Sequence, residues 1–219
     1  MNEDFILLDF DKQSPDEVLR KSEEFYTMIK KRRTVREYSN DNIPEEALIN
    51  IIKSAGTAPS GANKQPWKFF LIKDNEIRKQ IREAAESVEE ENYQSRFSES
   101  MKDDLKKLKT NSSKPFIEDA PYLIVMFKEK YQRINGKTVK NYYVNESCGI
   151  ALGILISALH YSGLATVTYT ANPMNFLNKI LNVPDNFSPY VILPVGFPKD
   201  GLSVPDISKK EVEEIIEFF

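Results

Sequence analysis

The distribution of apolar residues along the chain predicts four long helices and four short strands. In residues 15–31, the apolar side chains recur at helical spacing, at Val18, Leu19, Phe25, Met28 and Ile29. The other expected helices cover residues 42–56, 76–93 and 145–163, and the expected strands cover residues 68–73, 120–129, 164–170 and 190–198. Strands that are separated by long helices are typical of an α/β or α+β fold with one central sheet.

The segment 145–163 is apolar nearly all round and carries the small residues Ser147, Gly149 and Gly153. A helix with this pattern is buried, either in a large core or in a subunit interface. Its longest strongly apolar run is the segment 150–159, whereas a helix that spans a membrane needs ~20 apolar residues. We therefore expect no membrane partner.

The composition is that of an ordinary globular protein and predicts a single domain over residues 1–219. The 219 residues are 41% apolar and 29% charged, and the net charge of −3 comes from interleaved acids and bases, which argues against nucleic acid as a partner. Cys148 is the only cysteine, so a disulfide and a thiolate zinc cluster are excluded and no metal site is expected. The only histidine, His160, lies in the apolar helix and is expected to be packed there without a catalytic role. The acidic N-terminus lacks the basic region of a signal peptide, and we expect a cytoplasmic protein.

A long polar excursion from Glu89 to Lys114 separates segments that have core character. Polar loops of this length are uncommon unless they are lids or are disordered, and the high charge favours disorder without a ligand. Glu89 and Tyr93 are four residues apart, so they project from one face of a helix. On its own the acidic stretch is better explained as a solvated acidic face of a helix.

Three further motifs have the residue types of a cofactor site, although each also has a plain structural interpretation. The arginines of "RRTVR" (32–36) suit a phosphate or form a solvated basic patch, and "TAPSGANKQPW" (57–67) is a ligand loop or a connector. In "TVTYT" (166–170) the alternating threonines share one face of a strand, but threonine is also simply a good strand residue. The chain has no GxGxxG or GxxxxGK[ST] motif, so a bound nucleotide uses neither a Rossmann nor a P-loop cradle.

Together and in this order, the three motifs resemble the nitroreductase family of flavoproteins. "SAGTAPSGANKQPW", "EEENY", "DLKKLKTN", "TVTYT" and "LPVGFP…VPD" resemble in particular the iodotyrosine deiodinases, the dehalogenating branch of that family. The resemblance runs from about Phe25 to the C-terminus. It implies an α+β nitroreductase fold, with a central mixed sheet flanked by helices and a lid at about 89–114. It also implies an intertwined homodimer with the flavins at the subunit interface, and helix 143–162 is the candidate for the centre of that interface.

The resemblance also implies roles for individual residues. The expected FMN-binding residues are Arg32, Arg33, Thr34, Arg36, Ser60, Thr168, Thr170 and Lys209. Thr170 is the expected catalytic residue, with its hydroxyl by flavin N5. The expected substrate-binding residues are Ala62, whose surroundings offer backbone N–H groups to a phenolate, and Glu89, Tyr93 and Lys114, which grip the zwitterionic head of a halotyrosine. Tyr169 stands where the animal deiodinases tend to have threonine.

The implied activity is FMN-dependent reductive dehalogenation of a halogenated tyrosine or phenol, such as iodotyrosine to tyrosine and iodide, with electrons from NAD(P)H or a separate reductase. Three alternatives remain open. A general NAD(P)H-dependent nitroreductase or quinone reductase would not need Glu89 for turnover. A protein that binds FMN and an aromatic amino acid without turnover would release no halide, and a structural dimer without flavin would be colourless.

Overall fold

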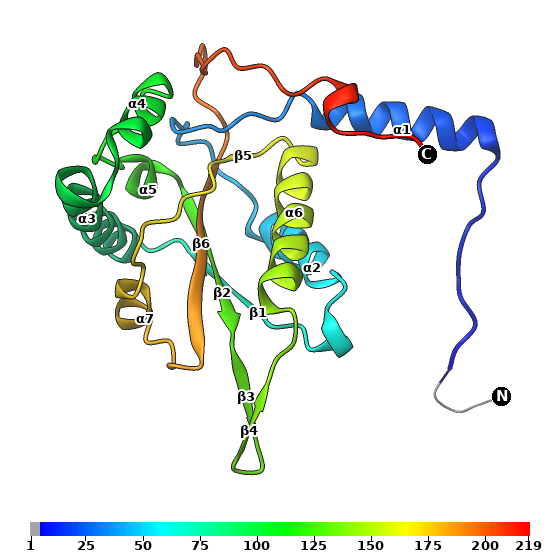
Figure 1. The fold of residues 1–219 in the computed structure, drawn as a ribbon, viewed down its shortest axis with the longest axis horizontal. Coiled ribbons are helices and arrows are strands. Elements are labelled where there is room, and N and C mark those ends of the chain that lie inside the picture. The colour runs from blue at the N-terminus through cyan, green and yellow to red at the C-terminus, as the bar shows by residue number, and fades with distance from the viewer. Residues whose placement is uncertain (1–4) are drawn as a thin grey trace. The chain divides into compact units, whose positions relative to one another are not determined.

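The computed structural model describes residues 5–219, which divide into two compact units, one ending at Arg32 and the other running from Arg33 to Phe219 (Figure 1). The first unit contains helix α1 (Pro15–Ile29), as the helical spacing predicts. Its start is fixed by Ser14, whose hydroxyl accepts a hydrogen bond of 3.2 Å from the Glu17 N–H. The second unit holds the sheet, both hydrophobic cores and the lid segment. A single domain over the whole chain stays a prediction.

The second unit is built on a four-stranded sheet with the strand order β1-β2-β6-β5. The strands are β1 (Trp67–Ile72), β2 (Tyr122–Glu129), β6 (Phe187–Gly196) and β5 (Ala165–Thr166). All three pairs of neighbouring strands are antiparallel. Within residues 5–219, parallel pairing is confined to a bridge between Thr34 and Thr166, so the expected mixed sheet is antiparallel in its main body.

Helices cover both faces of this sheet and create two hydrophobic cores (Figure 1). Helices α2 (Glu45–Gly56) and α6 (Val144–Tyr161) pack on one face, and α3 (Asn75–Glu91), α5 (Phe116–Asp119) and α7 (Phe176–Ile180) pack on the other. Strand β2 supplies Leu123 and Val125 to one core, and Ile124 and Met126 to the other. Its continuous apolar run reflects this burial on both faces.

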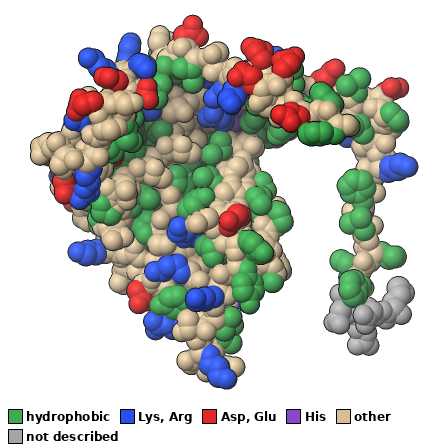
Figure 2. Space-filling model, viewed as in Figure 1, with side chains coloured by type: hydrophobic (Ala, Val, Ile, Leu, Met, Phe, Trp, Pro, Cys, Tyr) green, Lys and Arg blue, Asp and Glu red, His purple; other side chains and the backbone are tan. Residues whose placement is uncertain are grey.

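Helix α6 is buried on only one of its faces. Ser147, Cys148, Ala151, Leu155 and Leu159 lie in the core. On the other face, Ile150 is 46% exposed, and a Cβ atom added at Gly153 would meet no atom within 4 Å. Figure 2 shows hydrophobic side chains at the surface in this region. The sequence pattern predicts a buried helix, and within this chain only one face of α6 is buried.

Several short elements were not predicted from the sequence. Helix α4 (Glu99–Lys107) occupies the polar excursion and begins after Ser98, whose hydroxyl accepts a hydrogen bond from the Met101 N–H. The charge of this excursion favours disorder without a ligand, whereas Glu99–Lys107 is helical in the structure. The remaining elements are the helices α5 and α7, the hairpin β3 (Tyr131–Ile134) and β4 (Lys137–Lys140), and the single turns Gly61–Asn63, Asn92–Arg96 and Val212–Glu214.

The strand expected at 164–170 is regular only over its first residues. The chain leaves the sheet after Thr166 and returns at Tyr169, which exchanges two backbone hydrogen bonds of 2.9 Å with Ile192. In the part of the chain from residue 5 onward, no helix is long and apolar enough to cross a bilayer. The same residues contain no cluster of three or more histidine, cysteine or acidic side chains suited to a metal ion.

Candidate functional site

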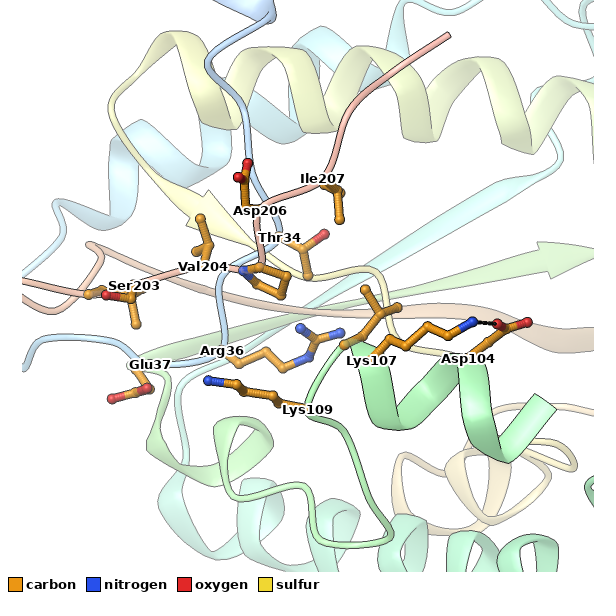
Figure 3. A pocket seen from close by; sticks show the side chains of 13 residues that line it. Thr34, Arg36, Glu37, Asp104, Lys107, Lys109, Ser203, Val204, Asp206 and Ile207 are labelled. Atoms are coloured by element: carbon orange, nitrogen blue, oxygen red, sulfur yellow. Dashed lines mark hydrogen bonds and ion pairs between the residues drawn. The ribbon is translucent and has the colours of Figure 1, made fainter. Parts of the chain in front are cut away.

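A cavity of about 790 Å³ lies in the second unit, between the segment 34–37, the end of α4 and the segment 202–207 (Figure 3). It is lined by Thr34, Arg36, Glu37, Asp104, Lys107, Leu108, Lys109, Leu202, Ser203, Val204, Pro205, Asp206 and Ile207. The volume falls within the range of small-molecule and cofactor sites. Two motifs of the sequence meet here, because Thr34 and Arg36 come from "RRTVR" and the segment 204–206 is the "VPD" motif.

Arg36 is a basic residue near the middle of this cavity. Figure 3 shows its guanidinium group near the middle of the cavity, with Lys109 beside it. The side chain is half-buried, burial lowers the pKa of its guanidinium, and it forms no ion pair with any carboxylate among residues 5–219. A partly buried cation without a counter-charge favours the binding of an anion. By contrast, Lys107 is paired with Asp104 at 2.9 Å.

The neighbouring residues of the arginine motif are tied to the same place. The Arg33 guanidinium donates a hydrogen bond to the Pro205 carbonyl, which links the motif to the segment that lines the cavity. The Val35 N–H donates to the Thr166 carbonyl at 3.2 Å, so the motif also lies beside the start of "TVTYT". Tertiary structure thus brings together three stretches that are far apart in the sequence.

The threonines of "TVTYT" do not share one face. Thr168 and Thr170 are exposed, whereas Thr166 is 5% exposed and faces the interior. The expectation of a common face was wrong for Thr166, because the chain leaves the sheet directly after it. Tyr169 points into the core, opposite to Thr168 and Thr170. Neither of the two exposed threonines lines the cavity itself.

The loop "TAPSGANKQPW" has an unusual backbone. Ala62, Asn63 and Gln65 have φ angles of 49°, 51° and 47°, a left-handed conformation that residues other than glycine rarely adopt. The Ser60 hydroxyl holds the loop by accepting a hydrogen bond of 2.9 Å from the Gln65 N–H. Gly61 is required by space, since a Cβ atom there would lie 2.8 Å from the Tyr143 ring. Strained backbone of this kind clusters at functional sites.

This loop is far from the cavity within one chain. Ser60 and Ala62 do not line it, and Figure 1 shows residues 60–65 (cyan) well separated from residues 202–207 (orange to red). Two other predicted residues are also outside the cavity. Lys209 is exposed and follows the lining residue Ile207 by two positions, and Arg32 belongs to the first unit.

The three predicted lid residues meet in one cluster, in which Glu89 and Lys114 are buried and Tyr93 is partly buried. Glu89 lies at the end of α3 and Tyr93 in the π-helical turn that follows, while Lys114 comes just before α5. The Lys114 ammonium lies 3.5 Å from a Glu89 carboxylate oxygen and 5.7 Å from the centre of the Tyr93 ring. The other Glu89 oxygen accepts a hydrogen bond of 3.2 Å from the hydroxyl of Tyr169. Oppositely charged groups, a phenol and an aromatic ring are therefore gathered in one place.

The electrostatics of the cluster connect it to the cavity. Burial lowers the pKa of Lys114, the charge of Glu89 opposes this shift, and the positive charge of Arg36 adds to it. Burial and the Glu89 charge both raise the pKa of Tyr93, so its phenol is the neutral form near neutral pH. The Tyr93 hydroxyl donates a hydrogen bond of 3.2 Å to the Thr110 carbonyl.

Glu86 anchors the predicted lid segment, although its sequence context does not single it out. One Glu86 oxygen accepts hydrogen bonds from the Lys114 N–H at 2.6 Å and from the Ser113 hydroxyl at 3.1 Å. The other carboxylate oxygen of Glu86 lies 2.5 Å from the Arg82 guanidinium, which also forms an ion pair with Glu118 at 2.6 Å. The helical spacing of Arg82 and Glu86 was available as a signal, but their partners beyond residue 110 were not. Lys107 and Lys109 of the cavity were missed for the same reason.

Cys148 does not belong to this site. Its thiol is buried in α6, donates to the Pro66 carbonyl at 3.5 Å, and has a pKa that burial raises to about 12. It is therefore a protonated, inaccessible thiol. His160 is partly buried near the end of α6.

Comparisons with known proteins identify the family. The profile of the nitroreductase family matches residues 29–197. The chain is 50% identical over 198 residues to an iodotyrosine deiodinase of Haliscomenobacter hydrossis, which covers 90% of this chain and 89% of that protein. It is 42% identical to the human iodotyrosine deiodinase 1, over 91% of this chain and 70% of that protein.

A solved structure supports the same family assignment. A crystal structure of oxidized iodotyrosine deiodinase bound to FMN and 3-iodo-L-tyrosine aligns with a TM-score of 0.76 and 35% identity, over 86% of this chain and 97% of that one. Its fold and its sequence both match those described above. The chain therefore belongs to the nitroreductase family, and within that family to the branch of the iodotyrosine deiodinases.

Proposed function

We propose that this protein catalyses the reductive dehalogenation of halotyrosines, converting iodotyrosine to tyrosine and iodide. It is an FMN-dependent oxidoreductase, as its family and its relatives imply. The choice of substrate rests on one observation: Glu89, Tyr93 and Lys114 form a largely buried cluster beside the cavity. A general nitroreductase or quinone reductase has no need of a carboxylate and an ammonium group held together in this way.

The residues of the cavity fit FMN. The half-buried Arg36, which has no carboxylate partner among the described residues, offers a site for negative charge, and the cavity volume is that of a cofactor site. In this proposal the FMN phosphate and ring edge are held by Arg32, Arg33, Thr34, Arg36 and Lys209, and the ring also contacts Ser60, Thr168 and Thr170. Bound FMN, in its reduced form, supplies two electrons.

Glu89 and Lys114 bind the two charges of the amino-acid head. Glu89 takes the substrate ammonium and Lys114 takes the carboxylate, while Tyr93 offers a hydroxyl and an aromatic ring. In the structure Glu89 and Lys114 neutralise each other at 3.5 Å. A zwitterion that inserts between them replaces one ion pair by two, so no charge is left buried without a partner.

The phenol end of the substrate is held by backbone donors. In this proposal the donors are the N–H groups near Gly61 and Ala62, which suit an anionic oxygen such as a phenolate. The Asn63 N–H already donates to the Ser60 carbonyl at 3.0 Å within the loop. Two electrons and one proton convert the carbon–iodine bond to a carbon–hydrogen bond and release iodide. The positive charge of Arg36 stabilises the negative charge that accumulates in the site before iodide leaves. Thr170 provides a hydroxyl group at the flavin and is the proposed catalytic residue.

A second copy of the chain completes the site. Ser60 and Ala62 lie far from the cavity of their own chain, so we infer that they serve the cavity of a partner in a homodimer. The apolar face of α6 that this chain leaves uncovered, with Ile150 and Gly153, supplies a contact surface for that partner. The electron source in this proposal is NAD(P)H or a separate reductase.

The proposal is tested by titrating the FMN-loaded protein with 3-iodotyrosine and with tyrosine, while the flavin fluorescence is followed. We expect tight quenching by 3-iodotyrosine and weak quenching by tyrosine. Reduction of the loaded protein with dithionite in the presence of 3-iodotyrosine should then release iodide. Absence of quenching by either ligand would overturn the proposed substrate class, and quenching without iodide release would identify a binding protein.

A further inference from the structure

Tyr169 links two parts of the proposed site. It stands between Thr168 and Thr170 in the sequence, and its hydroxyl contacts Glu89. Its neighbours Thr168 and Thr170 are exposed, whereas its own side chain is 7% exposed and points to the opposite side. Its backbone is fixed to the sheet by two hydrogen bonds of 2.9 Å with Ile192, and its ring packs edge-on against Phe116 at 5.8 Å between centroids. The side chain is therefore held rigidly by the main body of the protein.

From this position Tyr169 contacts both charges of the lid cluster. Its hydroxyl lies 3.2 Å from one oxygen of Glu89, and its ring lies 5.9 Å from the Lys114 ammonium. The other Glu89 oxygen faces Lys114. Burial and the neighbouring Glu89 charge raise the pKa of Tyr169, so its hydroxyl carries a proton and is the donor of this hydrogen bond.

We propose that Tyr169 is a positioning residue that orients the Glu89 carboxylate toward the ammonium group of an amino-acid substrate. By occupying one oxygen, it leaves the other free for the substrate when Lys114 turns to the substrate carboxylate. Its hydrogen bond also ties Glu89 to the segment that carries Thr168 and Thr170. This inference rests on the proposed function, since it assigns the ammonium of a halotyrosine to Glu89.

The test compares two ligands that differ in the amino-acid head. In the FMN-loaded Tyr169→Phe protein, we expect 3-iodotyrosine to bind about tenfold more weakly than in the wild type, a typical effect of losing one hydrogen bond to a charged group. The affinity for 2-iodophenol, which lacks the zwitterion, should be unchanged. In a Glu89→Gln background the same substitution should have little further effect, because its action passes through Glu89.

Tyr38→Phe is the matched control. Tyr38 is equally buried, and its hydroxyl hydrogen-bonds to the Val35 and Pro194 carbonyls and not to the lid. This variant should lose thermal stability, yet keep the wild-type ratio of the two affinities. If Tyr169→Phe weakens both ligands equally, or neither, the positioning role is overturned.

Amide hydrogen exchange of the ligand-free protein separates this inference from the proposed function. Tyr169→Phe should speed up exchange in the segment 92–114, and Tyr38→Phe should not. If exchange rises but the wild-type protein binds 3-iodotyrosine no better than 2-iodophenol, Tyr169 does hold the lid and the proposed substrate is wrong. Unchanged exchange in the Tyr169→Phe protein would overturn the inference.

Discussion

The Lys114 ammonium lies 3.5 Å from the Glu89 carboxylate, and the two side chains are only 5% and 7% exposed. A buried ion pair contributes little to stability, because removing two charges from water costs about as much as their attraction returns. Loss of one partner is costly, however, since the other charge is then buried alone. A pair placed beside a cavity in this way is better explained by the binding of a ligand with both charges than by stabilisation of the fold.

Glu89→Gln should weaken the binding of 3-iodotyrosine by at least about tenfold, because the substrate ammonium loses its counter-charge. The binding of 2-iodophenol should change little. Flavin fluorescence quenching measures both affinities. Glu90→Gln is the control, since Glu90 is the exposed neighbour on the same helix. If the Glu89→Gln protein bound 3-iodotyrosine as tightly as the wild type does, the proposed binding of the substrate ammonium by Glu89 would be wrong.

Arg36→Ala should lower the affinity for FMN by at least about tenfold, because the cavity loses its half-buried cation. Arg36→Lys should recover part of this loss, since lysine keeps the charge but lacks the planar fork of donors. The change in FMN fluorescence on addition to the apoprotein reports the affinity. Arg133→Ala, in the exposed hairpin, should bind FMN as the wild type does. Equal affinity of the Arg36→Ala protein would place FMN elsewhere.

Thr170→Ala should slow the release of iodide more than it slows the reduction of a nitroarene. The loss of a hydrogen bond accounts for up to about tenfold in rate. Both rates are measured on the same reduced, FMN-loaded preparation. Thr138→Ala removes an exposed hydroxyl from strand β4 and should change neither rate. Equal losses in the two reactions of the Thr170→Ala protein would rule out the proposed role at the flavin.

Ile150→Glu should shift the protein from dimer to monomer in sedimentation velocity, because a charge is introduced into the uncovered face of α6. Ile134→Glu is closely matched, since both isoleucines are 46% exposed and Ile134 lies in the β3–β4 hairpin. The hairpin variant should sediment as the wild type. A wild-type protein that is loaded with flavin and monomeric would refute the homodimer.

The anchoring of the lid by Glu86 should depend on pH. Burial raises the pKa of Glu86, but the Lys114 N–H, Arg82 and Ser113 together outweigh it, and the net pKa is lowered from 4.5. A carboxylate with a depressed pKa stabilises the folded state above its unfolded pKa, and this contribution is lost as pH falls through the folded value.

The difference in melting temperature between the wild type and the Glu86→Gln protein should therefore be largest above about pH 5.5. It should shrink as the pH falls below about 4.5. Glu83→Gln controls for the loss of a charge, because Glu83 lies on the same helix with a more exposed side chain and a longer contact to Arg82, 3.4 Å. A difference that stays constant down to pH 3 would mean that Glu86 does not act through its charge.

The main elements of the fold follow from the pattern of apolar residues along the chain. The continuous apolar run of β2 predicts a strand buried on both faces, and the apolar spacing of α1, α2 and α3 predicts helices close to their observed bounds. These patterns are local, since each follows from the period of one element and from the residues at its ends. The spacing of Glu89 and Tyr93 is local in the same sense.

Tertiary structure decided what the sequence pattern left open. Thr166 faces inward and Thr168 outward because the chain leaves the sheet between them, and no local period records that departure. Helix α4 and Lys109 reach the cavity, and Lys114 reaches Glu89, only because the chain folds back onto Glu86. Contacts between distant segments depend on packing and on the pairing of buried polar groups. The resemblance to a family therefore named Glu89 and Lys114 but neither Glu86 nor Lys109, and the folded chain brought them together.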